Sequence, residues 1–207
     1  MTRLLLVRHG ETAWNVEGRF QGHTDVPLSP HGRQQAAALA HILAAESVHA
    51  MYASDLQRAW ATALLLAAPS GLQVQQEPRL REITFGHWEG LTLVEIEQRH
   101  AMALVAWRAD PMQVAPPGGE TLTQVSSRVQ AVLASLAATG QEHTVVLVAH
   151  GGSLRVLLCL ALGLSPRAYR QFALAPGSLS ELYIDGQDAV LTRLNDTHHL
   201  SGVGHGS

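Results

Sequence analysis

The feature that most constrains the fold is a pair of unbroken apolar runs that end alike. "LLLVRHG" runs from Leu4 to Gly10, and "VVLVAHG" runs from Val145 to Gly151. Continuous runs of this kind, closed by a glycine, are typical of strands that are buried on both faces of a sheet. They predict a sheet with helices on both sides. A histidine that follows each core strand calls for a functional explanation.

Strand and helix patterns alternate along most of the chain. Ser29-Pro30 and Ser54 are predicted to start two helices, because Ser suits a helix N-cap and Pro the first turn. The alternation predicts an α/β fold with a mostly parallel sheet and helices on both faces. Strands are expected at Arg3–Arg8, Ala50–Ala53, Gln73–Gln76 and Thr144–Ala149, with a closing hairpin of Leu179–Ile184 and Val190–Leu194; helices are expected at Arg33–Ala45, Asp55–Ala67, Leu93–Arg108, Thr121–Thr139 and Leu154–Leu162.

Composition is that of one globular domain. The chain has 207 residues, of which 46% are hydrophobic and 15% charged, and its net charge is −3. We expect a single domain at residues 1–200 and a flexible tail at residues 201–207. The charge gives no general attraction to nucleic acid or acidic membranes, so neither is an expected partner. Without a signal peptide or a membrane-spanning run, and with Cys159 as the single cysteine, the expected location is the cytoplasm.

The two histidines that follow the core strands, His9 and His150, are candidate site residues. Ligands of open α/β sheets bind beyond the carboxyl ends of the strands, so these imidazoles would face each other if the strands are neighbours. Arg8 precedes His9, and Arg58 lies in the first turn of a predicted helix. Guanidinium groups suit phosphate, and the free N–H groups of the helix after Gly152 are a natural seat for an anion. The pattern predicts a phosphate site in which a neutral histidine is the candidate nucleophile.

Other chemistries are disfavoured. The 12 histidines form no HExxH motif and no zinc-site spacing, so no metal and no cofactor are expected. His198, His199 and His205 are interpreted as residues of a solvated tail. Cys159 lies among leucines and is expected in the core rather than as a nucleophile. The sequence has no GxSxG elbow and no Walker loop, which disfavours serine hydrolases and nucleoside triphosphatases.

Several short segments follow one another in a characteristic order. They are "VRHGETAWN" (Val7–Asn15), Gln21-Gly22, Asp25, "PLSPHGRQQA" (Pro27–Ala36), "SDLQRAWATA" (Ser54–Ala63), "LREITFGHWEG" (Leu80–Gly90), "GGET" (Gly118–Thr121) and "VAHGGSLR" (Val148–Arg155). In this order they resemble the histidine phosphatase superfamily, also called phosphoglycerate mutase-like, over nearly the whole chain. The resemblance implies the three-layer fold of that family.

The resemblance also implies roles for individual residues. It places the phosphorylated histidine on His9 and the proton donor on Glu82. The residues alone do not separate Glu82 from Glu11 or Glu89, which are interpreted as structural. The implied phosphate clamp consists of Arg8, Arg58 and His150, and the implied substrate-binding residues are Asn15, Gln21, Gly22 and Gly151.

The function that follows is that of a metal-independent phosphomonoesterase, which hydrolyses a small phosphorylated metabolite through a phosphohistidine intermediate. The first alternative is a cofactor-dependent phosphoglycerate mutase, although such mutases typically carry an "ERHYG"-like run and a longer insertion. A non-catalytic phospholigand-binding protein is less favoured, because His9 and Glu82 are both present. Residues 88–90 and 118–120 resemble α-ribazole phosphatases, and "LNDTHHL" resembles metal-independent phosphoserine phosphatases. A homodimer is compatible with the sequence.

Overall fold

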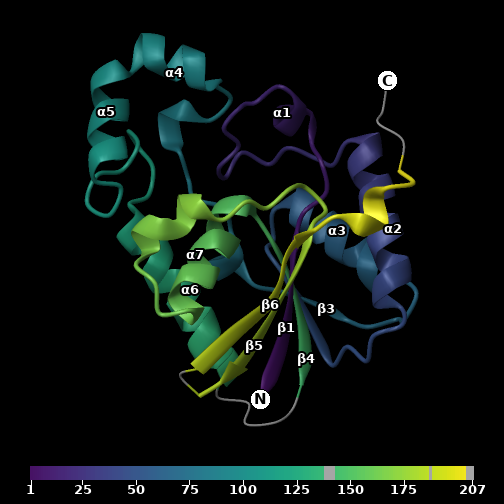
Figure 1. Cartoon of the computed structure of the whole chain (residues 1–207). Helices are drawn as coiled ribbons and strands as arrows, with labels where there is room; N and C mark the ends of the chain where they lie inside the picture. Colours follow the sequence, from purple (N-terminus) through teal and green to yellow (C-terminus); the bar gives the residue numbers. More distant parts are fainter. Residues whose placement is uncertain (138–142, 187, 204–207) are drawn as a thin grey trace.

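A six-stranded sheet lies at the centre of the computed structural model, which describes residues 1–137, 143–186 and 188–203 (Figure 1). The strand order is β3-β2-β4-β1-β5-β6. The parallel strands are β1 (Thr2–Arg8), β2 (Ala50–Ala53), β3 (Val74–Gln76) and β4 (Thr144–Ala149); β5 (Leu179–Asp185) and β6 (Asp188–Asp196) pair antiparallel at one edge. The predicted α/β class and mostly parallel sheet are confirmed. The turn of the predicted closing hairpin includes residue 187, which lies outside the described residues.

The sheet is buried on both faces, which explains the unbroken apolar runs. Leu4 and Leu6 of β1 pack on one side with α6 (Leu122–Ala137) and α7 (Gly151–Ala161). Leu5 and Val7 pack on the other side with α2 (Pro30–Leu43) and α3 (Gln57–Ala67). Because successive side chains of a strand point to opposite faces, a strand with two helical layers needs an apolar residue at every position.

The starts of α2 and α3 are stabilised in different ways. The Ser29 hydroxyl accepts a hydrogen bond from Gly32 N at 3.0 Å, so the predicted cap of α2 is confirmed. The predicted cap at Ser54 is wrong, because α3 begins at Gln57 and the residue before it is Leu56; the Ser54 hydroxyl accepts from Leu56 N at 3.4 Å and bonds to His150 at 2.8 Å. Asp25, from a distant loop, accepts from Gln57 N at 2.7 Å and takes the place of a local cap.

The prediction of one helix over Leu93–Arg108 is also wrong. The segment forms α4 (Leu93–Arg99) and α5 (Ala101–Ala109), which are separated at His100 (φ −135°, ψ 31°). The break lets both helices pack on one small cluster, made of Trp88, Ile96, Leu104 and Trp107. Figure 1 shows α4 and α5 as an arm above the α6–α7 side of the sheet. The loop predicted between this segment and α6 is confirmed.

Shorter elements complete the chain. The structure adds α1 (Ala13–Val16) and the 3₁₀ turns η1 (Pro78–Leu80), η2 (Gly86–Trp88), η3 (Pro166–Gln171) and η4 (His198–Leu200), none of which the sequence patterns predict. Helix α7 begins at Gly151, three residues before the predicted Leu154, and the predicted end of α6 at residue 139 lies outside the described residues.

The C-terminal segment is less solvated than expected. The His199 ring bonds to the Gly177 carbonyl oxygen at 3.0 Å, so its interpretation as a solvated tail residue is wrong, whereas His198 is exposed. His205 and the rest of residues 204–207 lie outside the described residues. The single domain at residues 1–200 and the flexible tail stay predictions. Within the part of the chain that the structure describes, no helix is long and apolar enough to cross a membrane.

Candidate active site

The two predicted histidines meet at the carboxyl end of the sheet. Strands β1 and β4 pair in parallel, with Arg8 opposite Ala149, and His9 N donates to Ala149 O at 2.9 Å. His9 and His150 are the next residues of the two strands, so they leave the sheet side by side. Their ring centroids are 5.0 Å apart. The expectation that these imidazoles face each other is confirmed.

The His9 ring is held in one tautomer. Its Nδ1 lies 2.7 Å from the Gly10 carbonyl oxygen, which can only accept, so Nδ1 carries the proton and Nε2 carries the lone pair. The residue is 2% exposed, and burial, followed by the charges of Arg58 and Arg8, lowers the pKa of His9 well below its usual value of 6.5. His9 is thus a neutral imidazole with its Nε2 lone pair available at neutral pH.

His150 is also buried and neutral. Burial, together with the charge of Arg58, lowers the pKa of His150 well below 6.5. Its Nε2 lies 2.8 Å from the Ser54 hydroxyl, whereas its buried Nδ1 has no hydrogen-bond partner among the described residues. Buried polar atoms are nearly always bonded, so Nδ1 marks a position where a ligand atom fits.

Three arginines supply positive charge at this edge. Arg58 is fully buried on α3, and its guanidinium donates to the carbonyl oxygens of Gly22 and Thr24 at 2.7 and 3.0 Å. Arg8 donates to Leu174 O, and burial lowers the pKa of Arg8 to about 10, so it stays charged at neutral pH. The Nε atoms of Arg8, Arg58 and Arg155 are buried without a partner in the described chain. These N–H groups suit a bound oxyanion.

Arg155 is the member of this group whose role was not predicted from the sequence. It lies on α7 four residues after Gly151. Residues four apart share one face of a helix, so the spacing from the His-Gly-Gly segment was the available signal.

Glu82 lies against the N-terminus of α7. Its carboxylate accepts hydrogen bonds from the N–H groups of Ile83, Gly152 and Ser153 at 2.9, 3.0 and 3.2 Å. The N–H groups at the start of α7, which were predicted to bind an anion, therefore bind the carboxylate of Glu82. The contact requires glycine at 152, because a Cβ there would overlap Oε1 of Glu82.

Arg128 on α6 fixes the backbone that carries Glu82. Its guanidinium donates to the carbonyl oxygens of Arg79, Arg81 and Glu82 at 2.7, 2.6 and 2.9 Å. The Glu120 carboxylate pairs with the same guanidinium at 3.0 Å. These long-range hydrogen bonds hold the backbone on both sides of Arg81, where Glu82 lies in no strand or helix.

The other acidic candidates have structural contacts. Burial raises the pKa of Glu89, but hydrogen bonds from Thr24, His23, Thr84 and Phe85 outweigh it and leave the pKa below its usual value. These bonds tie the loop after Gly22 to the segment after Glu82. Glu11 accepts from the Ser29 hydroxyl at 3.0 Å, beside the start of α2.

The predicted substrate-binding residues are divided between two places. Asn15 and Gln21 both bond to Thr12, with Oδ1 of Asn15 accepting from Thr12 N and the Thr12 hydroxyl donating to Gln21 Oε1. Gly22 contributes the carbonyl that holds Arg58. Gly151 and Arg8 line a cavity beside this cluster, whereas Asn15, Gln21 and Gly22 do not line it.

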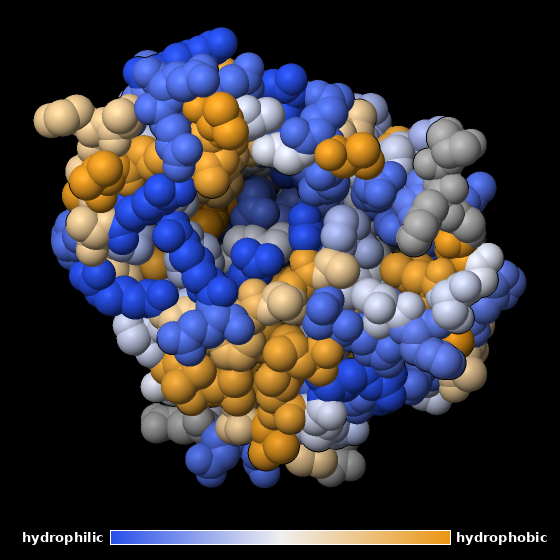
Figure 2. Space-filling view, turned by 45° about the horizontal axis from the view of Figure 1, so that its top comes forward, coloured by the Kyte–Doolittle hydropathy of each residue, from blue (hydrophilic) through white to orange (hydrophobic). Residues whose placement is uncertain are grey.

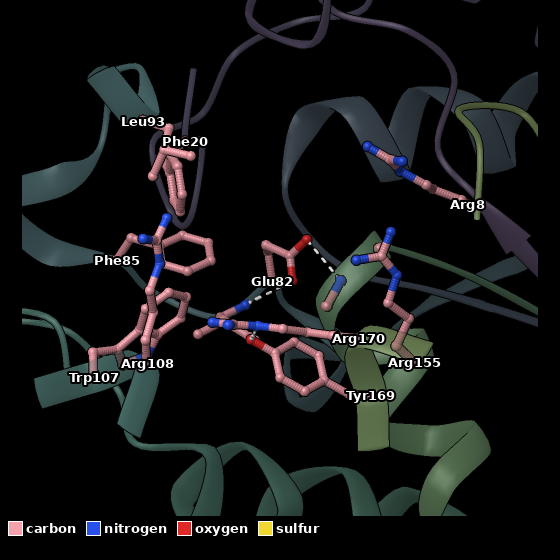
Figure 3. Close-up of a pocket in the computed structure, with 13 residues that line it drawn as sticks. Arg8, Phe20, Glu82, Phe85, Leu93, Trp107, Arg108, Arg155, Tyr169 and Arg170 are labelled. Carbon is pink, nitrogen blue, oxygen red and sulfur yellow. Dashed lines mark hydrogen bonds between the residues drawn. The ribbon is translucent and has the colours of Figure 1, made fainter. Parts of the chain in front are cut away.

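A cavity of about 430 Å³ opens beside this cluster. Figure 2 shows a hollow with hydrophobic residues along one wall and hydrophilic residues around the rest. Close up, Arg8 and Arg155 lie on one side of Glu82, and aromatic side chains lie on the other (Figure 3). The lining residues are Arg8, Phe20, Glu82, Ile83, Phe85, Leu93, Trp107, Arg108, Gly151, Gly152, Arg155, Tyr169 and Arg170.

Two neutral imidazoles, a set of guanidinium groups and one carboxylate are the groups that phosphoryl transfer through a histidine requires. The sequence model of the histidine phosphatase superfamily (branch 1) matches residues 4–197. The chain therefore belongs to this superfamily, and it is a phosphoric monoester hydrolase.

Named relatives agree with this assignment. Phosphoserine phosphatase 1 of Hydrogenobacter thermophilus is 35% identical over 97% of this chain and 95% of its own length. Glucosyl-3-phosphoglycerate phosphatase of Mycolicibacterium vanbaalenii is 40% identical over 78% of this chain and 75% of its own. The crystal structure of the α-ribazole phosphatase from Shigella flexneri has a TM-score of 0.87 at 32% identity, covering 99% of this chain and 100% of that one.

The buried neutral histidines predict a pH-dependent stability. On unfolding, His9 and His150 regain an ordinary pKa near 6.5, so below that pH the unfolded chain binds protons that the folded chain does not. These groups should leave the free energy of unfolding unchanged above about pH 7. Below 6.5 it should fall by up to about 1.4 kcal/mol per pH unit for each histidine.

Urea unfolding of wild type, His9→Asn and His41→Asn between about pH 5 and pH 7 measures this. His9→Asn should remove one histidine's share of the slope, and the exposed His41 serves as the control. A slope in His9→Asn equal to that of the wild type would contradict the prediction.

A second prediction concerns the close approach of α7 to Glu82. Gly152→Ala should displace the Glu82 carboxylate and lower the rate on an alkyl phosphate about tenfold or more, because the added Cβ would overlap Oε1 of Glu82 and would also lie only 2.9 Å from the side chain of Ile83. Gly202→Ala, which places its methyl group in open space, is the matched control. Steady-state kinetics and urea unfolding should show a loss of rate with the fold retained; an unchanged rate would mean that the position of Glu82 is unimportant.

Proposed function

We propose that the protein hydrolyses phosphate monoesters of small metabolites in two steps through a phosphorylated His9. The observation that carries the proposal is the state of this histidine. Its Nδ1 proton is bonded to the Gly10 carbonyl, its ring is neutral, and its pKa is lowered by the nearby charges of Arg58 and Arg8, whose Nε–H groups have no partner among the described residues. A neutral imidazole can attack phosphorus while guanidinium groups stabilise the charge of the transferred phosphoryl group.

In the first step, the His9 Nε2 lone pair forms a bond to phosphorus, and the bond from phosphorus to the ester oxygen breaks. Glu82, in its protonated form, gives its proton to the departing oxygen. In the second step, Glu82 takes a proton from water, the water oxygen attacks phosphorus, and the bond to Nε2 breaks. Inorganic phosphate is released, and both residues return to their starting states.

The remaining site residues bind and orient the phosphoryl group in this proposal. Arg8, Arg58, Arg155 and Nδ1 of His150 hold its oxygens, supported by their buried and partnerless nitrogen atoms. The backbone at Gly151 lines the cavity, and the carbonyl of Gly22 orients Arg58. Asn15 and Gln21 have a supporting role in this proposal, because their side chains bond to Thr12 and do not line the cavity. The arginines supply the positive charge that Mg²⁺ supplies elsewhere, so no metal is required.

The alternative, a phosphoglycerate mutase, has less support, because the relatives described above are named phosphatases. A small phosphorylated metabolite is the substrate class we propose. The absence of nucleic-acid and membrane partners, the cytoplasmic location and a homodimer stay predictions.

Trapping the covalent intermediate tests the function. Brief exposure of the wild type to a phosphate monoester labelled at phosphorus should give an acid-labile, base-stable phosphoprotein, because phosphohistidine has that stability. His9→Ala should give none, and its urea unfolding should stay cooperative. EDTA should leave the turnover unchanged. Label on a serine, aspartate or cysteine, or activity that requires a divalent ion, would overturn the mechanism.

A further prediction isolates the role of Glu82. Glu82→Gln should slow phosphorylation of His9 most with alkyl phosphates, whose leaving groups need a proton, and much less with p-nitrophenyl phosphate. General acid catalysis is worth about 10²–10⁴-fold, so single-turnover rates for the two substrates should separate by that order. Equal slowing of both substrates would make Glu82 a binding or structural residue.

A further inference from the structure

We propose that the outer half of the cavity binds the leaving group, and that it selects phosphate esters whose leaving group has an apolar or aromatic body and one carboxylate. Arg170 is the residue that binds this carboxylate. The inference rests on the proposed function, because it names the class of substrate for the same site. It is carried by the arrangement of aromatic rings and arginines around Glu82.

Glu82 lies between two chemically different halves of the cavity. In Figure 3, Arg8 and Arg155 lie on one side of Glu82, and Phe20, Phe85 and Trp107 lie on the other. If the phosphoryl group binds at the arginines beside Gly151, a carboxyl group at the boundary can reach the ester oxygen. The rest of the substrate then extends into the aromatic half.

The aromatic half is a preformed surface. Phe20 and Phe85 pack edge to face with their ring centroids 4.9 Å apart, and Phe85 and Trp107 do the same at 6.2 Å. Trp107 is only 7% exposed, because it also packs on the fully buried Trp88 at 5.3 Å. Rings that are fixed by a core cluster give an apolar ligand a preformed contact surface at little entropic cost.

Of the four arginines that line the cavity, Arg170 is the one whose charge is left for the leaving group. Arg8 and Arg155 belong to the phosphate half, and Arg108 pairs with Glu97 at 3.3 Å. No carboxylate of the described chain lies within ion-pair distance of Arg170. Its guanidinium stacks on the Trp107 ring, with Cζ 4.3 Å from the centroid.

Arg170 is also oriented by a neighbour. Its Nε donates to the hydroxyl of Tyr169 at 3.0 Å, and Tyr169 itself is 6% exposed. Stacking and this bond fix the plane of the guanidinium and leave its two terminal NH₂ groups for a ligand. Such a planar fork matches a carboxylate with two parallel hydrogen bonds. One unpaired cation favours one carboxylate over a second phosphate, which carries more charge.

The test uses a pair of substrates that differ only in the predicted group. Benzyl phosphate and 4-carboxybenzyl phosphate have similar leaving alcohols, but only the second has a carboxylate. We expect the wild type to prefer the carboxylated ester by about tenfold in kcat/KM, as for a partly exposed charge-assisted bond. Arg170→Met should abolish the preference through a higher KM for that ester, with a much smaller change in kcat/KM for benzyl phosphate. Arg170→Lys, which keeps the charge and loses the fork, should restore part of it.

Arg33→Met is the matched control, because it removes the same charge from α2, away from the cavity. Equal rates of the wild type on both esters would overturn the inference, as would a loss in Arg170→Met that is the same for both. If the wild type hydrolysed neither ester and formed no phosphohistidine, the proposed function would fail. In that case, calorimetry measures the affinity of both esters for the wild type and for Arg170→Met. Tighter binding of 4-carboxybenzyl phosphate by the wild type, but not by Arg170→Met, would support the subsite, and equal affinities would overturn it.

Discussion

The parallel pairing of β1 with β4 is the constraint on which the rest of the site depends. Because the strands are in register from Arg3 with Thr144 to Arg8 with Ala149, both chains leave the sheet at one level. A shift of one residue would turn every side chain of the strand to the opposite face and separate the two imidazoles. The register is fixed by alternating apolar contacts with helices on both faces, so the packing of the core determines the 5.0 Å between the rings of His9 and His150.

Burial has different consequences for the two kinds of basic residue at this edge. It lowers the pKa of His9 from a value already near neutrality, and the ring becomes neutral. It also lowers the pKa of Arg8, but only to about 10, and the guanidinium keeps its charge. One environment thus leaves an imidazole neutral and a guanidinium charged side by side, which are the states that the proposed nucleophile and phosphate clamp require. The cost of burying Arg58 is offset by the carbonyl oxygens of the Gly22–Thr24 loop, which Glu89 holds in place.

The sequence predicted the parts of this site that depend on local pattern. Apolar runs closed by glycine identified β1 and β4, and the position of His9 and His150 after them predicted their meeting. Glu82 could be assigned only through the resemblance, because its position depends on Arg128, 46 residues away on α6, and on contact with α7. The break at His100 and the capping of α3 by Asp25 likewise depend on tertiary contacts. Hydrophobic periodicity carries no information about such contacts.

The two halves of the site depend on different parts of the fold. The phosphate half is built within a few residues of the ends of β1, β2 and β4, where the sheet itself fixes the geometry. The proposed leaving-group half comes from Phe20, Phe85, Trp107 on α5 and Arg170 on η3, which are far apart in the sequence and converge on a small cluster around Trp88. Substitutions on α5 or η3 can therefore alter the second half while leaving the register of β1 and β4 intact. The proposed chemistry depends on the core of the fold, whereas the proposed substrate selection depends on α5, η3 and two loop residues around the cluster of Trp88.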